Sequence, residues 1–309
     1  MALPITFFVG LYLRLFTTTG PEELKLSYKW FTKCNCLPVR FHYHQPIIKE
    51  DMLPENYEQI EQKLIGINLD IESQLRLLRN FNYNAELESI SLDKTENYEP
   101  YYRNGFFGTG DGEILYSIVR HYKPKRIIEI GSGYSTRFIL AAAQKNKRSS
   151  NTGTELICIE PFQNKWLGKM GITILRKQVQ EFDLSFFEKL SENDILFIDS
   201  SHIIRTQGDV AFEYLSIIPS LGKGVIVHAH DIFLPKGYPL KEIIERKYFW
   251  NEQYLLQALL SHSQRYKILL SLNYLSNHHR SDLEKCCPVF TKESEDAGPS
   301  SFWFQVISD

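Results

Sequence analysis

The chain has 309 residues, a length that suits one α/β core of about 200 residues preceded by an N-terminal extension. Hydrophobic residues make up 43% of the chain and aromatic residues 13%, so a large core can be buried and a globally disordered chain is excluded. The formal net charge of -2 gives no electrostatic signature of nucleic-acid binding, so the expected partner is a small molecule or another protein.

An apolar segment near the N-terminus, residues 5–16, is shorter than the roughly 20 residues that span a bilayer. No basic segment precedes it and no small-residue cleavage site follows it before Gly20-Pro21, so a secretory signal is not expected. We expect a docked helix, or a segment that weakly faces a membrane or forms a homodimer contact, and no stable membrane span. The chain up to about residue 55 is otherwise expected to be irregular.

The cysteines are Cys34, Cys36, Cys158, Cys286 and Cys287. Their odd number, with two of them adjacent, does not match a disulfide framework, which favours a reducing, cytoplasmic location. A zinc site that includes the nearby His278 and His279 is the alternative. The cysteine spacing differs from that of zinc fingers, so free thiols are expected.

Two helices are predicted before the chain changes its rhythm at Pro124. Apolar residues recur at helical spacing over residues 69–81, with acidic residues in the first turn. Asp111 is expected to cap a second helix that ends before Pro124. Between them, the aromatic residues and glycines of residues 98–110 are consistent with either a lid over a ligand or an ordinary packed connection.

After Pro124, short β-branched runs alternate with helical stretches. The runs are Arg126–Ile130, Glu155–Glu160, Gly171–Leu175, Asp194–Asp199 and Gly224–His230, with helices predicted at Thr136–Lys145, Ser185–Leu190 and Gln207–Ile217. Continuous apolar runs are typical of strands buried on both faces of a parallel sheet, so the pattern predicts a doubly wound α/β fold. A helix over residues 251–260 and β-like runs at Tyr266–Leu270 and Phe302–Ile307 follow. We expect an extension over residues 1–97, partly helical and able to serve as a substrate lid or dimer contact, and a main domain over residues 98–309.

A glycine loop joins the first predicted strand to the next helix. Glu129-Ile-Gly131-Ser-Gly133 places glycines where a backbone can closely approach a ligand at a helix N-terminus. Thr136 stands where the dinucleotide fingerprint has glycine or alanine. An acidic residue two positions before the first glycine suits a cofactor with an ammonium group, such as S-adenosylmethionine. Glu160 ends the next strand, where a carboxylate can accept both ribose hydroxyls; a tight turn without a ligand is the structural alternative.

The segment Ile128-Glu-Ile-Gly-Ser-Gly-Tyr-Ser-Thr136 resembles motif I of the class I S-adenosylmethionine-dependent methyltransferases. Three further segments resemble a bacterial subgroup of small-molecule methyltransferases within that family: Ile195-Leu-Phe-Ile-Asp-Ser-Ser-His202, Val225-Ile-Val-His-Ala-His-Asp231 and Trp250-Asn-Glu-Gln-Tyr254. The resemblance covers about residues 98–307. It implies a Rossmann-like sheet of seven strands, mostly parallel with an antiparallel last strand. It also implies that Gly131, Ser132, Gly133 and Ser135 contact the methionine end of the cofactor and Glu160 its ribose. A third glycine is frequent in the family at the position of Ser135.

Acidic and histidine side chains follow the fourth and fifth predicted strands, at the edge where open α/β sheets bind ligands. Asp199 and His202 follow one strand, and His230 and Asp231 the other. These side chains could bind Mg²⁺ or another divalent ion, act as a metal-free general base, or serve structural hydrogen bonds. Related sugar and catechol O-methyltransferases carry metal-binding carboxylates at these strand ends, although His230 here replaces a second acid. We predict catalytic roles for Asp199, His202 and His230, and a metal site at Asp199, His230 and Asp231.

We therefore predict an enzyme that methylates a small molecule, with an oxygen acceptor on a sugar or natural product favoured by the resemblance. An NAD-dependent oxidoreductase and a non-catalytic Rossmann-like assembly module are the alternatives.

Overall fold

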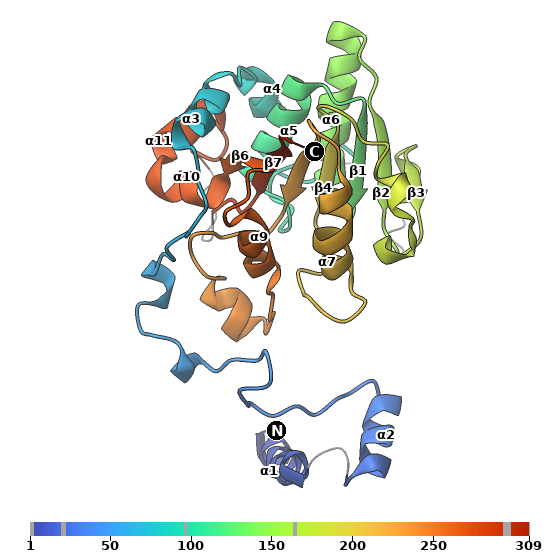
Figure 1. Ribbon diagram of the computed structural model, residues 1–309, viewed down its shortest axis with the longest axis vertical. Coiled ribbons are helices and arrows are strands. Elements are labelled where there is room, and N and C mark those ends of the chain that lie inside the picture. The colour runs from blue at the N-terminus through green and yellow to red at the C-terminus, as the bar shows by residue number, and fades with distance from the viewer. Residues whose placement is uncertain (1–2, 20–22, 96–97, 163–165, 293–297, 309) are drawn as a thin grey trace. The chain divides into compact units, whose positions relative to one another are not determined.

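The β-branched runs form one seven-stranded sheet in the computed structural model, which describes residues 3–19, 23–95, 98–162, 166–292 and 298–308. The strands are β1 (Arg126–Ile130), β2 (Glu155–Ile159), β3 (Thr173–Leu175), β4 (Ile195–Ile198), β5 (Ile226–Ala229), β6 (Tyr266–Ser271) and β7 (Phe302–Val306). Their spatial order is β3-β2-β1-β4-β5-β7-β6 (Figure 1). Strands β1 to β5 are parallel, and β7 is antiparallel to both of its neighbours, β5 and β6. The predicted Rossmann-like sheet with an antiparallel last strand is confirmed.

Helices cover both faces of the sheet. The α-helices of the described residues are α1 (Leu3–Thr19), α2 (Lys25–Lys33), α3 (Ile71–Arg79), α4 (Asn84–Glu88), α5 (Asp111–Tyr122), α6 (Tyr134–Ser150), α7 (Asp209–Phe212), α8 (Ile218–Ser220), α9 (Glu252–Leu260), α10 (Leu272–His278) and α11 (Arg280–Cys286). A π-helical turn, Glu213–Ile217, joins α7 to α8, and a second one lies at Lys241–Glu245.

Two buried clusters explain why the strands are apolar on both sides. Side chains point alternately to the two faces of a strand. In β1, Ile127 belongs to a cluster with α3, α5, α6, α10 and α11, whereas Ile128 belongs to a cluster with α7, α8, α9 and the π-helical turn between them. The central strands β4 and β5 are buried at every residue. Burial of both faces is the arrangement expected of a parallel sheet between two helical layers.

Several predicted elements differ from the structure. The expected helix at residues 185–190 is replaced by a 3₁₀ turn, Leu184–Phe186, whose flanking backbone bonds include Phe187 N–H to the Leu184 carbonyl. Helices α2, α10 and α11 were not predicted. Asp111 does not cap α5: Gly110 occupies the cap position, and the Asp111 carboxylate accepts the backbone N–H groups of Ser300 and Ser301 instead. A contact nearly 190 residues away along the chain therefore overrides the local capping preference.

The chain divides into two compact units, one formed by Met1–Tyr57 with Leu240–Phe249 and the other by Glu58–Pro239 with Trp250–Asp309. Helix α3 contacts β6 and α11, so it belongs to the unit that holds the sheet. The expected boundary at residue 97 and the Gly20-Pro21 position lie outside the described residues, and the boundary stays a prediction. None of the helices in the described ranges is long and apolar enough to cross a membrane.

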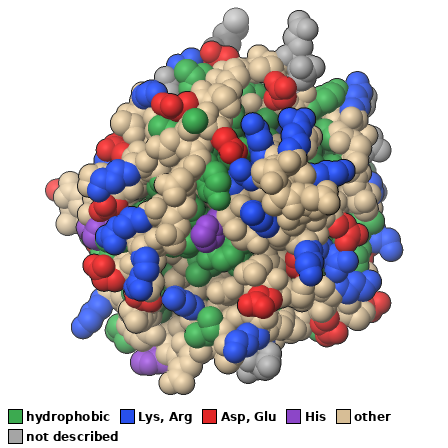
Figure 2. Space-filling view, turned by 90° about the horizontal axis from the view of Figure 1, so that it is seen from above, with side chains coloured by type: hydrophobic (Ala, Val, Ile, Leu, Met, Phe, Trp, Pro, Cys, Tyr) green, Lys and Arg blue, Asp and Glu red, His purple; other side chains and the backbone are tan. Residues whose placement is uncertain are grey.

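One face of the molecule is shown in Figure 2. Lys and Arg side chains lie there among Asp and Glu side chains, with apolar side chains exposed between them. This mixture of charges agrees with the formal net charge of -2 over the whole chain.

Candidate active site

Strand register brings the predicted site residues to one edge of the sheet. In the pairing of β1 with its two neighbours, Ile130 lies opposite Ile159 of β2 and Ile198 of β4, and Ile198 lies opposite Ala229 of β5. The next residues along the chain are Gly131, Glu160, Asp199 and His230. The carboxyl ends of these four adjacent strands are level, as in other open α/β sheets that bind ligands at this edge.

The two glycines of the loop have different roles. Gly131 has a φ of +78°, and a Cβ atom built on it would lie 1.7 Å from the carbonyl oxygen of Asp199. Only glycine fits, because the backbone that follows β4 occupies the space of a side chain. A Cβ atom on Gly133 would meet nothing within 4 Å. Gly131 is therefore required by the packing of the protein itself, whereas the space beside Gly133 is open to a ligand.

Glu129 lies beneath the loop and fixes its shape. Its buried carboxylate accepts hydrogen bonds from the hydroxyls of Ser135 and Thr136, both at 2.7 Å, and from the thiol of Cys158 at 3.2 Å. Burial raises the pKa of Glu129 to about 7, and these hydrogen bonds partly offset the shift. Glu129 and Ser135 are thus engaged with each other in this structure, and both hold the first turn of α6 in place.

Glu160, at the end of β2, also contacts the loop. One of its carboxylate oxygens accepts the N–H of Ser132 at 3.2 Å, and the other accepts the N–H of Phe162 at 2.8 Å. A cavity of about 350 Å³ opens beside it, lined by Gly131, Glu160, Phe162, Val179 and Asp199 among others. The cavity therefore extends from the glycine loop past the end of β2, and both polar and apolar residues line it.

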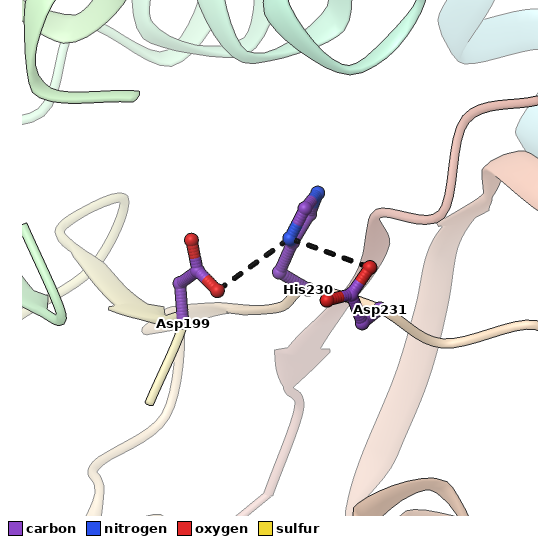
Figure 3. A group of neighbouring side chains, drawn as sticks. All are labelled: Asp199, His230 and Asp231. Carbon is purple, nitrogen blue, oxygen red and sulfur yellow. Dashed lines mark ion pairs between the residues drawn. The ribbon is translucent and has the colours of Figure 1, made fainter. Parts of the chain in front are cut away.

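The second predicted group forms a cluster at the ends of β4 and β5 (Figure 3). Nδ1 of His230 lies 3.5 Å from Oδ1 of Asp199 and 3.8 Å from Oδ1 of Asp231. Nε2 of His202 lies 3.3 Å from Oδ1 of Asp199 and 3.5 Å from Oδ2 of Asp231. The two aspartates thus lie between the two imidazoles. His202 and Asp231 both have a positive φ, +58° and +54°, which is uncommon for residues other than glycine.

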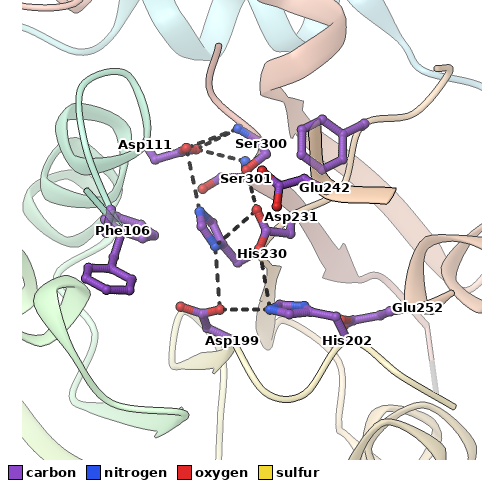
Figure 4. A network of polar contacts seen from close by, with 12 residues as sticks. Phe106, Asp111, Asp199, His202, His230, Asp231, Glu242, Glu252, Ser300 and Ser301 are labelled. Carbon is purple, nitrogen blue, oxygen red and sulfur yellow. Dashed lines mark hydrogen bonds and ion pairs between the residues drawn. The ribbon is translucent and has the colours of Figure 1, made fainter. Parts of the chain in front are cut away.

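Two further carboxylates hold the histidines from behind (Figure 4). Oε2 of Glu252, at the start of α9, lies 2.8 Å from Nδ1 of His202, and the other Glu252 oxygen accepts the Tyr214 hydroxyl at 2.7 Å. Oδ2 of Asp111, at the start of α5, lies 3.6 Å from Nε2 of His230. Each imidazole therefore has one nitrogen toward a supporting carboxylate and the other toward Asp199 and Asp231.

The charges in the cluster shift the pKa values of its members. Burial disfavours a charged His202, but its contacts with Asp199 and Glu252 outweigh burial and raise its pKa well above the usual value. For His230, the charges of Asp231 and Asp199 likewise overcome burial and raise the pKa. The pKa of Asp199 is lowered, because the two histidines outweigh the effect of its own burial. Without a bound cation, the cluster thus favours protonated His202 and His230 beside an ionised Asp199.

The structure brings all the predicted catalytic and metal-binding residues together. Among the described residues, one group of histidine, cysteine and acidic side chains has the geometry to hold a metal ion: Asp199, His230 and Asp231. His228 lies deeper on β5, stacks on Phe197 with ring centroids 3.9 Å apart and pairs with the Ser301 hydroxyl, as expected of a core histidine.

Sequence reasoning missed Asp111 and Glu252 as members of the cluster. Asp111 was predicted only as a helix cap, and Glu252 lies in the segment Trp250–Tyr254 that resembles the family, where no role was assigned to it. The aromatic segment after residue 98 is largely packed: Tyr102 and Phe107 are buried, while Phe106 is exposed and stacks on Tyr134.

A comparison with known proteins identifies the family of this chain. A family model described as a methyltransferase domain matches residues 128–232, which contain the glycine loop and both strand ends of the cluster. An uncharacterised protein of Archaeoglobus fulgidus is 33% identical over 182 residues, which cover 54% of this chain and 80% of that protein.

Two solved structures are similar at low identity. One is an O-methyltransferase from Bacillus cereus in complex with S-adenosylhomocysteine, with 14% identity and a TM-score of 0.38, covering 76% of this chain and 91% of the other. Another is a phosphoethanolamine N-methyltransferase from Haemonchus contortus, in complex with phosphomonomethylethanolamine and S-adenosylhomocysteine. It has 13% identity and a TM-score of 0.37, covering 67% of this chain and 55% of the other.

The fold and the family match define the class: this is an S-adenosylmethionine-dependent methyltransferase of class I. The chain belongs to the family whose methyltransferase domain matches its residues 128–232, and the archaeal protein is a relative of the chain. The predicted family and enzyme class are confirmed, and the dehydrogenase and assembly-module alternatives are set aside.

Proposed function

We propose that the cofactor binds with its methionine end along Gly131, Ser132 and Gly133 and its ribose at Glu160. The open space beside Gly133, and the cavity of about 350 Å³ lined by Gly131 and Glu160, support this orientation. Helix α6 begins directly after the same loop, and the backbone N–H groups of a helix's first turn, which have no acceptor within the helix, suit a carboxylate such as that of the methionine end. Glu129 and Ser135 then act by holding the loop, and the carboxylate of Glu160 accepts hydrogen bonds from the ribose hydroxyls.

We propose further that a small molecule binds over the cluster and is methylated on oxygen. The observation that carries this proposal is the position of Asp199. Its carbonyl oxygen packs against Gly131 of the loop, and its carboxylate faces both His230 and His202. Methyl transfer is an in-line displacement, so the methyl donor and the acceptor atom must lie side by side. Asp199 belongs to both regions, which supports an acceptor bound next to the sulfonium.

The cluster fits a divalent cation held by Asp199, His230 and Asp231. Metal ligands about 2.0–2.2 Å from an ion lie roughly 3–3.6 Å apart at tetrahedral or octahedral angles. The contacts of His230 Nδ1 with the two aspartates, at 3.5 and 3.8 Å, are near that range and longer than good hydrogen bonds. Two carboxylates and an imidazole are ligands for hard or borderline ions such as Mg²⁺ and Mn²⁺. When bound, such an ion orients an acceptor hydroxyl and lowers its pKa.

The surrounding residues orient these ligands. Asp111 faces Nε2 of His230, so its carboxylate favours the tautomer that presents a free Nδ1 to an ion. Glu252 fixes the His202 ring, and the other ring nitrogen of His202 can donate a hydrogen bond to Asp199 or Asp231. A metal-free histidine base is the second candidate. It is less well supported, because a raised pKa keeps His202 and His230 protonated at neutral pH, and a protonated imidazole cannot accept the acceptor's proton.

A chelator experiment separates the two mechanisms, once a screen with labelled donor has identified an acceptor. With a metal, chelation should abolish methyl transfer, leave S-adenosylhomocysteine affinity nearly unchanged, and be reversed by Mg²⁺ or Mn²⁺. Asp199→Asn and Asp231→Asn should each lower the rate severely, whereas the control Asp282→Asn, outside the cluster, should not.

A metal-free base predicts full activity in chelator and a loss of about 10²–10⁴-fold in His202→Ala or His230→Ala. Chelator resistance together with full activity of both histidine variants would refute a catalytic role for the cluster.

The acceptor class is proposed from the family resemblance: a hydroxyl of a sugar or natural product. We also propose that residues 1–97 supply a homodimer contact or a substrate lid.

A further inference from the structure

Helices α1 and α2 form an apolar and basic surface in the smaller of the two units. Among the described side chains of α1, Phe16 is the buried one, and its ring lies 4.9 Å from Tyr28 and 5.1 Å from Phe31 of α2, measured between centroids. These aromatic contacts join the two helices. They leave most of α1 uncovered.

The uncovered part of α1 is apolar around most of its circumference. Large apolar side chains are exposed at eight positions: Leu3, Ile5, Phe7, Phe8, Val9, Leu11, Tyr12 and Leu15. At about 100° per residue, these positions span roughly 240° of the helix. A helix that packs on a protein surface needs an apolar stripe of only about 100° or somewhat more. The remaining arc of roughly 120° contains Thr6, Gly10 and Thr17, so α1 suits an apolar environment that covers most, but not all, of its circumference.

Helix α2 supplies the charge. Lys25, Lys29 and Lys33 are spaced four residues apart, so they share one side of the helix, and all three are exposed. The exposed Leu26 and Trp30 form a second row beside them, and Nζ of Lys33 lies 4.6 Å from the centroid of the Trp30 ring. With Arg14, the two helices carry four basic residues and no acidic residue, in a chain whose net charge is -2.

We propose that α1 and α2 bind the surface of an anionic membrane. Apolar and aromatic side chains beside a row of lysines are the features of helices that lie at the boundary between headgroups and acyl chains. Lysine stems can pack along the apolar layer while their ammonium groups reach lipid phosphates. Helix α1, with 17 residues, is about 25 Å long, which is shorter than the hydrocarbon core of about 30 Å. It therefore lies in the membrane surface and does not span the bilayer. A second copy of the chain fits this surface less well than a membrane does, because the lysines of one copy would face the lysines of the other.

Co-sedimentation of the full chain with vesicles tests the proposal. The protein should pellet with vesicles of phosphatidylcholine and phosphatidylserine, and much less with phosphatidylcholine alone. Replacing Lys25, Lys29 and Lys33 together by glutamine should weaken binding roughly 100-fold, at about fivefold for each lysine. Phe8→Asp should also release the protein from vesicles.

Matched variants serve as controls. Lys94, Lys145 and Lys147, replaced together by glutamine, and Leu215→Asp change exposed residues of the other unit and should leave vesicle binding unchanged. All variants should keep wild-type affinity for S-adenosylhomocysteine, which reports on the larger unit, and the wild-type far-UV circular dichroism spectrum, which includes the signal of α1 and α2. The proposal is overturned if the wild type does not bind phosphatidylserine vesicles, or if the Lys25/Lys29/Lys33 variant binds them as tightly as the wild type does. It is also overturned if light scattering finds a lipid-free dimer that Phe8→Asp dissociates, because α1 would then contact a second copy.

Discussion

The two glycines of the cofactor loop provide a sharp test of the proposed binding site, because the structure assigns them opposite sensitivities. A Cβ atom at Gly131 would lie 1.7 Å from the Asp199 carbonyl oxygen, and the residue has a φ of +78°. At Gly133 the same atom meets no protein atom within 4 Å. A side chain at Gly131 should therefore damage the fold, and a side chain at Gly133 should exclude only the ligand.

For Gly131→Ala, the left-handed backbone and the clash with the strand-end backbone should together cost about 3 kcal/mol or more. At about 2–4 °C for each kcal/mol in a domain of this size, the melting temperature should fall by roughly 6–12 °C. For Gly133→Leu, the melting temperature without ligand should stay within about 2 °C of the wild type. S-adenosylhomocysteine affinity should fall at least 100-fold, which is about 2.7 kcal/mol.

Calorimetric titration with S-adenosylhomocysteine and a thermal melt of each variant are sufficient measurements. The reasoning is refuted if Gly133→Leu binds the ligand with unchanged affinity, because the methionine end then does not lie in this loop. It is also refuted if Gly131→Ala melts like the wild type, because the close contact with Asp199 then does not exist in solution.

Three further predictions follow from single carboxylates. Glu160→Ala should weaken S-adenosylhomocysteine binding by about 1–3 kcal/mol in calorimetry, with Glu160→Gln less affected, and unchanged affinity in both would exclude the ribose contact. Because burial raises the pKa of Glu129 from 4.5 to about 7, the folded state is favoured while Glu129 is protonated, and this contribution is lost as the pH rises from about 4.5 to 7. Between pH 5 and pH 8, the free energy of unfolding measured in urea should fall by up to about 3 kcal/mol more for the wild type than for Glu129→Gln. An equal fall in both proteins would contradict the raised pKa of Glu129. Asp111→Asn should weaken Mn²⁺ binding, measured by electron paramagnetic resonance, by about 10–100-fold, whereas an affinity as high as that of the control Asp282→Asn would exclude Asp111 as the support of His230.

The sheet could be predicted because each strand is indicated by residues that are adjacent in the sequence. Runs such as Asp194–Asp199 are apolar without alternation, which is typical of strands buried on both faces, and the glycine loop follows directly from the first of them. Strand order then brings Asp199 and His230 to one edge by topology alone. These features need no knowledge of contacts between distant residues.

The carboxylates that contact the two histidines of the cluster, Glu252 and Asp111, could not be predicted from local sequence. Glu252 reaches His202 across 50 residues of sequence, and Asp111 accepts hydrogen bonds from Ser300 and Ser301, nearly 190 residues further along the chain. In the sequence each is an acid near the start of a predicted helix, where capping or the helix dipole is enough to explain it. Helices α10 and α11, with seven residues each, are too short for a clear apolar period and are formed by packing on the sheet.

The most direct test of the proposed cofactor and metal sites is a crystal structure with S-adenosylhomocysteine and Mn²⁺, recorded with anomalous data for the metal. We expect one anomalous peak between Asp199, His230 and Asp231. The methionine end of the ligand should lie on Gly131–Gly133, with its sulfur toward that peak. A ligand bound away from the glycine loop, or a well-bound Mn²⁺ elsewhere with none between these three residues, would contradict the proposed sites.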